Sequence, residues 1–78
     1  MKHELKILPK YYKAIIDNKK TFELRKNKNN YKVGDILILK EYKNEIFTGN
    51  ECQKKITYVL KNVENYGLKK GFVILSLK

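Results

Sequence analysis

The stretch 17-DNKKTFELRKN-27 carries a turn, a strand and the only arginine of the chain. Its segment TFELR alternates apolar and polar side chains with a period of two. This period predicts a β-strand whose Phe22 and Leu24 face the protein interior, while Glu23 and Arg25 lie on the opposite, polar face. Glu23 and Arg25 are therefore expected side by side, about 7 Å apart along the strand.

Arg25 is the one arginine in a chain that otherwise takes its positive charge from lysine. A guanidinium differs from an ammonium because its planar fork of donors can hold a carboxylate, a phosphate or a base edge through two parallel hydrogen bonds. Two interpretations follow. Arg25 holds such a group while Glu23 orients it, or the two side chains form an exposed ion pair that contributes little stability.

Before this stretch, the sequence predicts a short strand and a helix. Residues 3–8 alternate, and Leu8-Pro9 then marks a boundary, because a residue before proline avoids helical angles and proline suits the first helical position. Apolar side chains recur at spacings of three and four and predict an amphipathic helix over residues 9–18. Asn18 is suited to the left-handed conformation that ends such a helix.

After this stretch, the sequence predicts three more strands. A strand begins after a Gly34-Asp35 turn that the Asp35 side chain is expected to close, and its apolar residues predict burial on both faces. A long hairpin with a turn at Thr48-Gly49-Asn50 leads to a returning strand over residues 52–61. The last strand covers residues 72–78. The aromatic side chains expected in the core are Phe22, Phe72, Tyr12 and Tyr58.

These elements predict a single domain over residues 1–78. A chain of 78 residues has no room for a second core. Five short strands and one early helix do not alternate as βαβ units, and they are typical of a mostly β, α+β protein. The expected architecture is a small, partly open β-barrel.

The formal net charge of +10 is the strongest compositional signal. Such an excess on a small domain indicates a polyanionic partner, with nucleic acid favoured over a membrane surface. The alternative is a surface that is simply well solvated. No apolar run approaches the roughly 20 residues of a spanning helix, and charges interrupt the N-terminal MKHELKILPK, so neither a membrane anchor nor a signal peptide is expected.

The chain holds one cysteine and one histidine, Cys52 and His3. A lone cysteine excludes an internal disulfide and fits the reducing cytoplasm. His3 has no serine or cysteine in an obvious partnership, which argues against a histidine-based triad. One cysteine and one histidine do not make a zinc site by themselves. We therefore expect a cytoplasmic protein with no metal and no cofactor.

Three blocks of the sequence together resemble a known family. They are IIDNKKTFELRKN, YKVGDILILKEY and YGLKKGFVILSLK. In this order they resemble the short bacterial and phage branch of the ASCH superfamily, whose members have a PUA-like β-barrel. That family usually has glycine where this chain has Asn18, and both residues tolerate the left-handed turn.

The resemblance implies an RNA-binding role, with a cleft beside the Lys20-x-x-Glu23-x-Arg25 strand as the site. Lys19 and Lys20 belong to the turn that leads into this strand. Arg25 would hold a phosphate or a base edge, while Glu23 orients it or accepts from a base amino group. Tyr42 and Phe47 at the hairpin are candidates for stacking on bases.

Two other functions remain open. Some ASCH relatives resemble small amidohydrolases that act on an acylated cytidine nucleoside through a lysine, a threonine and a glutamate. Here Lys20 and Arg25 match that pattern, but Glu23 replaces the nucleophilic threonine, so an enzyme would have to use Lys20, Thr21 and Glu23 in changed roles. The third possibility is a phage or mobile-element accessory factor that binds a protein, with the charge serving solubility.

Overall fold

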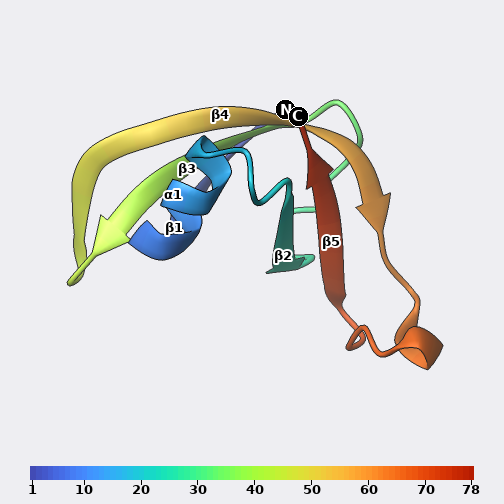
Figure 1. Ribbon diagram of the computed structural model, residues 1–78. Coiled ribbons are helices and arrows are strands. Elements are labelled where there is room, and N and C mark those ends of the chain that lie inside the picture. The colour runs from blue at the N-terminus through green and yellow to red at the C-terminus, as the bar shows by residue number, and fades with distance from the viewer.

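A five-stranded sheet and one α-helix make up the fold in the computed structural model, which describes residues 1–78 (Figure 1). This confirms the mostly β, α+β class. The elements in chain order are β1 (Lys2–Ile7), α1 (Pro9–Ile16), β2 (Phe22–Lys26), β3 (Ile36–Lys43), β4 (Ile46–Leu60), the 3-10 turn η1 (Glu64–Tyr66) and β5 (Phe72–Leu77).

The strands form one mixed sheet in the order β1-β3-β4-β5-β2. β1 runs parallel to β3, and all other neighbours are antiparallel. β4 arches over the molecule: its first part pairs with β3, and its last part pairs with β5 (Figure 1). β1 and β2 remain the two edges, so the sheet is strongly curved but is not closed into a barrel.

The core lies on the concave side of this arch. It is built from side chains of α1, of every strand except β2, and of the loop before β3. Its ten members are Leu5, Ile7, Ile15, Tyr31, Leu37, Leu39, Ile56, Val73, Leu75 and Leu77. α1 contributes Ile15, with Tyr12 packed against the cluster. No helix here has the length and apolarity needed to span a membrane.

The helix ends slightly earlier than the sequence predicts. Pro9 occupies its first turn as expected, and the last helical residue is Ile16 rather than Asn18. Asn18 follows with a φ of 57°, which confirms the left-handed turn expected there. This turn directs the chain into β2 and places Lys20 two residues before that strand.

The predicted orientation of β2 is wrong. Phe22 and Leu24 are 47% and 52% exposed, whereas Glu23 is only 5% exposed. β2 is an edge strand whose inner side faces a cleft rather than the apolar core, so its polar residues point inward and its apolar residues point outward. The alternation of apolar and polar side chains correctly predicts a strand, but it does not show which of the two sets is buried.

The hairpin turn also differs from the prediction. β3 and β4 are joined by Asn44 and Glu45, both with positive φ (50° and 64°), as in a two-residue type I′ turn. Thr48-Gly49-Asn50 instead lies within β4. There the side chains of Thr48 and Asn50 donate hydrogen bonds to Glu41 Oε1, at 2.7 and 3.1 Å.

A register shift in β4 explains why Tyr58 lies outside the core. The shift falls between Ile56 and Tyr58, where β4 leaves β3 and joins β5. It leaves Ile56 fully buried and Val59 packed against the core, and Tyr58 turns outward with 59% of its surface exposed. Phe72 and Tyr12 are half-buried, so of the four expected core aromatics only Tyr12 packs against the core.

Candidate functional site

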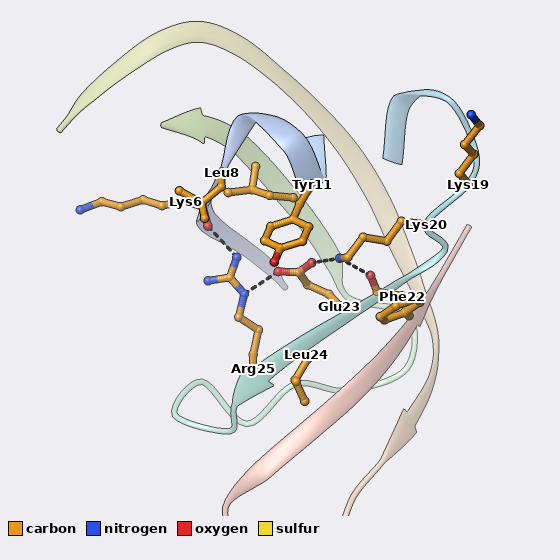
Figure 2. Close-up of a pocket in the computed structure, with 10 residues that line it drawn as sticks. Lys6, Leu8, Tyr11, Lys19, Lys20, Phe22, Glu23, Leu24 and Arg25 are labelled. Atoms are coloured by element: carbon orange, nitrogen blue, oxygen red, sulfur yellow. Dashed lines mark hydrogen bonds and ion pairs between the residues drawn. The ribbon is translucent and has the colours of Figure 1, made fainter. Parts of the chain in front are cut away.

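An open cleft of about 640 Å³ lies between the two edge strands and the start of α1 (Figure 2). Its volume falls within the range of small-molecule sites. The strand that carries the Lys20-x-x-Glu23-x-Arg25 pattern forms one wall. Ten residues line the cleft: Lys6, Ile7, Leu8, Tyr11, Lys19, Lys20, Phe22, Glu23, Leu24 and Arg25.

Glu23 is the buried centre of the cleft. Its Oε1 accepts a hydrogen bond from Lys20 Nζ at 2.5 Å, and its Oε2 accepts one from Arg25 Nε at 2.7 Å. Figure 2 shows the carboxylate between the two cations, with the ring of Tyr11 alongside. The predicted pairing of Glu23 with Arg25 is confirmed, and Lys20 joins it. Both carboxylate oxygens therefore hold a cation in a fixed position.

Arg25 also links the two edges of the sheet. Its Nη2 donates to the backbone carbonyl of Lys6 on β1, at 2.6 Å. A lysine ammonium could not reach both this carbonyl and Glu23 with the same planar geometry. The guanidinium has five N–H donors, and these two bonds leave three for another partner. The single arginine is thus both a tie between β1 and β2 and a partly free donor in the cleft.

Part of the cleft lining is apolar and aromatic. Tyr11 from α1 and Phe22 from β2 are 42% and 47% exposed. Lys20 Nζ lies 5.7 Å from the Tyr11 ring centroid and 4.9 Å from the Phe22 ring centroid, within cation–π range of both. Leu8 and Leu24 add exposed apolar surface at the rim. A flat, partly apolar group could contact these rings while an anionic group meets the cations.

The charge of the cleft is positive. Lys6, Lys19, Lys20 and Arg25 supply four cations, and Glu23 is the one carboxylate among the lining residues. The side chains of Lys6 and Lys19 extend away from Glu23 on opposite sides of the cleft (Figure 2). They therefore lie where an extended anion would leave the cleft, whereas Lys20 and Arg25 lie inside it.

The structure brings together four of the predicted site residues, namely Lys19, Lys20, Glu23 and Arg25. The remaining two nucleic-acid candidates, Tyr42 and Phe47, are not part of the cleft. They form an edge-to-face pair on the hairpin with ring centroids 5.0 Å apart. Lys6 connects the two regions, because its Nζ lies 4.6 Å from the Tyr42 ring centroid.

The contributions of β1 and α1 to the cleft were not predicted from the sequence. Leu8 and Tyr11 were assigned only to the first strand and the helix, and Lys6 was given no role. Lys6 takes part through its backbone carbonyl, which leaves no trace in a side-chain pattern. One feature of the sequence could have indicated the role of Tyr11. It lies one helical turn before Ile15, and a tyrosine beside a core residue is often only partly buried.

Thr21, the nucleophile that a hydrolase would need, does not line the cleft. It lies in a separate, smaller hollow together with Asn18, Lys20, Lys54, Leu77 and Lys78. Its backbone carbonyl accepts a hydrogen bond from Leu77 N at 2.9 Å, which ties it to β5. Lys20 and Glu23 are therefore close together, but the lining residues offer no serine, threonine or cysteine to act with them.

A second buried carboxylate, Asp35, has a different environment. Its Oδ2 lies 2.8 Å from His3 Nε2, and it accepts a hydrogen bond from Lys32 N at 3.1 Å, which confirms that Asp35 closes its turn. Tyr31 packs edge-on against His3, with ring centroids 4.8 Å apart. The hydrogen bond from His3 lowers the pKa of Asp35 to about 2, with smaller contributions from Lys32 N and the N-terminal amine.

Comparison with known proteins assigns the family. Residues 2–77 match the family described as "Domain of unknown function (DUF3850)". The chain belongs to this family. This DUF3850 domain is also 42% identical, over 57 residues, to the "Uncharacterized 12.9 kDa protein in GpA 3'region" of Escherichia phage P2. The similarity covers 73% of the chain and 52% of the phage protein, so the domain spans about half the length of that relative.

Proposed function

We propose that this domain binds single-stranded RNA and takes one nucleotide into the cleft between β1, α1 and β2. The observation that carries the proposal is that the cations at the centre of the cleft are held in place and still have free hydrogen-bond donors. Glu23 holds Lys20 and Arg25 in place, yet three N–H groups of Arg25 remain free to donate. Donors that are fixed in advance lose little entropy when an anion binds.

Each part of the cleft matches one part of a nucleotide. The phosphate would accept hydrogen bonds from Arg25, and the base would stack on Tyr11 or Phe22, whose rings are partly exposed. Lys6 and Lys19 would contact the neighbouring phosphates on either side. Both oxygens of Glu23 are already engaged, which favours a positioning role for this residue over direct recognition of a base amino group.

The resemblance to the ASCH superfamily supports RNA over other polyanions. We propose that the curved sheet is a PUA-like barrel that is open between β1 and β2, with the bond from Arg25 to Lys6 bridging the opening. The cleft is then the open seam of the barrel. The proposed place of action is the cytoplasm. Burial raises the pKa of the Cys52 thiol, which lowers the fraction of reactive thiolate.

The other two functions have less support from the geometry. The amidohydrolase would need a nucleophile beside Lys20 and Glu23, and Thr21 lies in another hollow. A protein-binding accessory factor would not need cations held in place by a buried carboxylate. Both remain hypotheses. They would be favoured over RNA binding if the domain does not bind RNA.

Fluorescence anisotropy with labelled single-stranded RNA tests the proposal. Contact with about four phosphates predicts that the logarithm of the binding constant falls with the logarithm of salt concentration with a slope near −3. Tyr11→Ala should weaken binding roughly fivefold to a hundredfold, the range for one stacked base. Tyr66→Ala is the matched control, because Tyr66 is 86% exposed and lies outside the cleft.

The control should bind RNA like the wild type. No binding at low salt, or equal affinities for the two tyrosine variants, would contradict the proposed cleft. Incubation with acylated cytidine then becomes the next test: turnover that is lost in Lys20→Ala and Thr21→Ala would support the hydrolase.

A further inference from the structure

The sheet carries a second exposed surface on the side of β2 and β5 that faces away from the core. Cross-strand pairing aligns its members: Leu24 pairs with Ile74, and Ile74 pairs in turn with Leu60. None of these side chains is fully buried. We call this surface the outer sheet face, and its apolar members are Phe22, Leu24, Tyr58, Leu60, Phe72 and Ile74.

No helix covers the outer sheet face. The one α-helix packs on β3, at the other end of the arch (Figure 1). Phe22, Leu24 and Tyr58 consequently keep 47%, 52% and 59% of their surface exposed. A contiguous apolar surface of this kind usually marks a binding site.

Four lysines, Lys26, Lys28, Lys69 and Lys70, border one end of the outer sheet face. We call them the lysine cluster, and they surround a hollow of about 330 Å³ that also contains Phe72. None of the four forms an ion pair with a carboxylate. Lys69 Nζ lies 5.9 Å from the Phe72 ring centroid, just as Lys20 Nζ lies near Phe22 at the opposite end.

The whole net charge of the protein lies in two segments of the sequence that contain most of this face. Residues 18–32 and 54–78, which include β2, β5 and the last part of β4, hold 12 of the 18 basic residues and 2 of the 8 acidic residues. The remaining chain holds six of each and is neutral. A second copy of the chain is a poor occupant for this face, because two surfaces of this charge repel each other.

A polyanion with flat apolar groups fits both properties of the surface. Single-stranded nucleic acid supplies phosphates for lysines and bases for aromatic rings. Phe22 belongs both to the cleft and to the outer sheet face, so one strand can pass from one to the other over this ring. β2 covers about 13 Å from Phe22 in the cleft to Lys26 in the lysine cluster, and this is the length that the RNA strand would have to cross.

We propose that the outer sheet face and the lysine cluster form a second contact surface for the same RNA strand. Nucleotides that follow the one in the cleft stack on this face, and the lysine cluster holds their phosphates. This inference rests on the proposed function, since it extends the strand that enters the cleft. It predicts that the domain reads a segment of RNA longer than the cleft can hold.

Binding of a short and a long oligonucleotide separates the two surfaces. A dinucleotide reaches only the centre of the cleft, whereas an octanucleotide also reaches Lys6, Lys19 and the outer sheet face. The octanucleotide should therefore bind more tightly, and the variants of the outer sheet face show how much of the gain comes from that face. Lys69→Ala/Lys70→Ala should make the salt slope of octanucleotide binding shallower by about 1.4. The matched control is Lys2→Ala/Lys43→Ala, which removes two exposed lysines from the neutral half and should leave the slope nearly unchanged.

Tyr58 tests the stacking surface directly. Tyr58→Ala should weaken octanucleotide binding at least about fivefold, and Tyr58→Phe, which keeps the ring, should not. Neither variant should change dinucleotide binding, and thermal melts check that both fold. If both oligonucleotides bind equally well, or if the double-lysine variant matches its control, the inference is wrong while the proposed cleft stands. If neither oligonucleotide binds, the proposed function itself has failed.

Discussion

Two buried carboxylates, Glu23 and Asp35, occupy contrasting regions of this molecule. Each is at most 9% exposed, and each has a basic side chain within 2.8 Å. Asp35 is enclosed by His3 and its own turn, where it ties the start of β1 to the start of β3. Glu23 instead opens onto a cleft and holds two cations, of which Arg25 keeps free donors.

The contrast shows that a buried ion pair does not by itself mark a functional site. The pKa of Asp35 is strongly lowered, yet His3 and Asp35 belong to none of the main hollows of the surface. The environment of Glu23 is distinguished by space and by spare hydrogen-bond donors, which are the properties a ligand needs. We therefore assign Asp35 a structural role and propose that Glu23 positions the two cations of the cleft.

The largest effect is expected when Glu23 is removed. Glu23→Ala would leave Lys20 and Arg25 close together without their shared carboxylate, and should lower the free energy of unfolding by about 2–3 kcal/mol. This lies below the range for a fully enclosed pair, because both cations keep some contact with solvent. Urea unfolding measures it. The control Glu51→Ala, at an exposed position, should change stability by less than about 0.5 kcal/mol.

RNA binding should also weaken in Glu23→Ala, because Lys20 and Arg25 are no longer held in place. Stability equal to that of Glu51→Ala would show that Glu23 does not organise the cleft. The comparison between the two buried carboxylates would then lose its basis.

The elements of the fold followed from the sequence, and their boundaries and facing largely did not. Period-two segments predicted β1, β2 and the returning part of β4, apolar runs predicted β3 and β5, and Pro9 predicted the start of the helix, because these signals are local. The sequence could not predict that the Glu23 side chain points inward, because this depends on β1 lying opposite β2. Likewise Tyr58 turns outward because β4 changes partners at the register shift beside it.

The candidate site was predictable only where it lies on one continuous segment. Lys19, Lys20, Glu23 and Arg25 fall within seven positions of each other, so the turn and the strand place them together. Tyr11 and the carbonyl of Lys6 come from elements that reach the cleft through long-range packing. Tyr42 and Phe47 were assigned to the site because they are aromatic and near a turn, and the hairpin places them outside the cleft.

A smaller effect is expected for Arg25→Lys. From the sequence alone, an exposed pair with Glu23 predicts a stability change below about 1 kcal/mol. The bonds to Glu23 and to the Lys6 carbonyl now predict a loss of about 1–2 kcal/mol, since a lysine can keep only one of them. Thermal melts measure the loss, with Lys26→Ala as an exposed control on the same strand.

The same Arg25→Lys variant should keep the salt slope of RNA binding, because the charge is unchanged. It should lose about 1–3 kcal/mol of discrimination between RNA sequences if the guanidinium contacts a base edge. Unchanged stability would show that the tie between β1 and β2 is unimportant.

The smallest effect is expected on acidification, through the carboxylate of Asp35. Its folded-state pKa of about 2 lies below its ordinary value of 3.8, so the carboxylate stabilises the fold fully above about pH 4. This contribution is lost progressively as the pH falls toward 2. Thermal melts between these values should show the loss, and Asp35→Asn should show a flatter dependence on pH. An equally steep dependence in the variant would assign the acid sensitivity to other carboxylates.

The most direct test of the central claim is a map of backbone amide chemical shifts during titration with single-stranded RNA. The cleft and its Glu23-centred cations predict the largest changes at residues 19–26 and at Tyr11. The amides of His3, Tyr31 and Asp35 should stay nearly unchanged, because that cluster faces no cleft. Changes concentrated around His3 and Asp35, or no changes at all, would contradict the assignment of the binding site to Glu23 and its two cations.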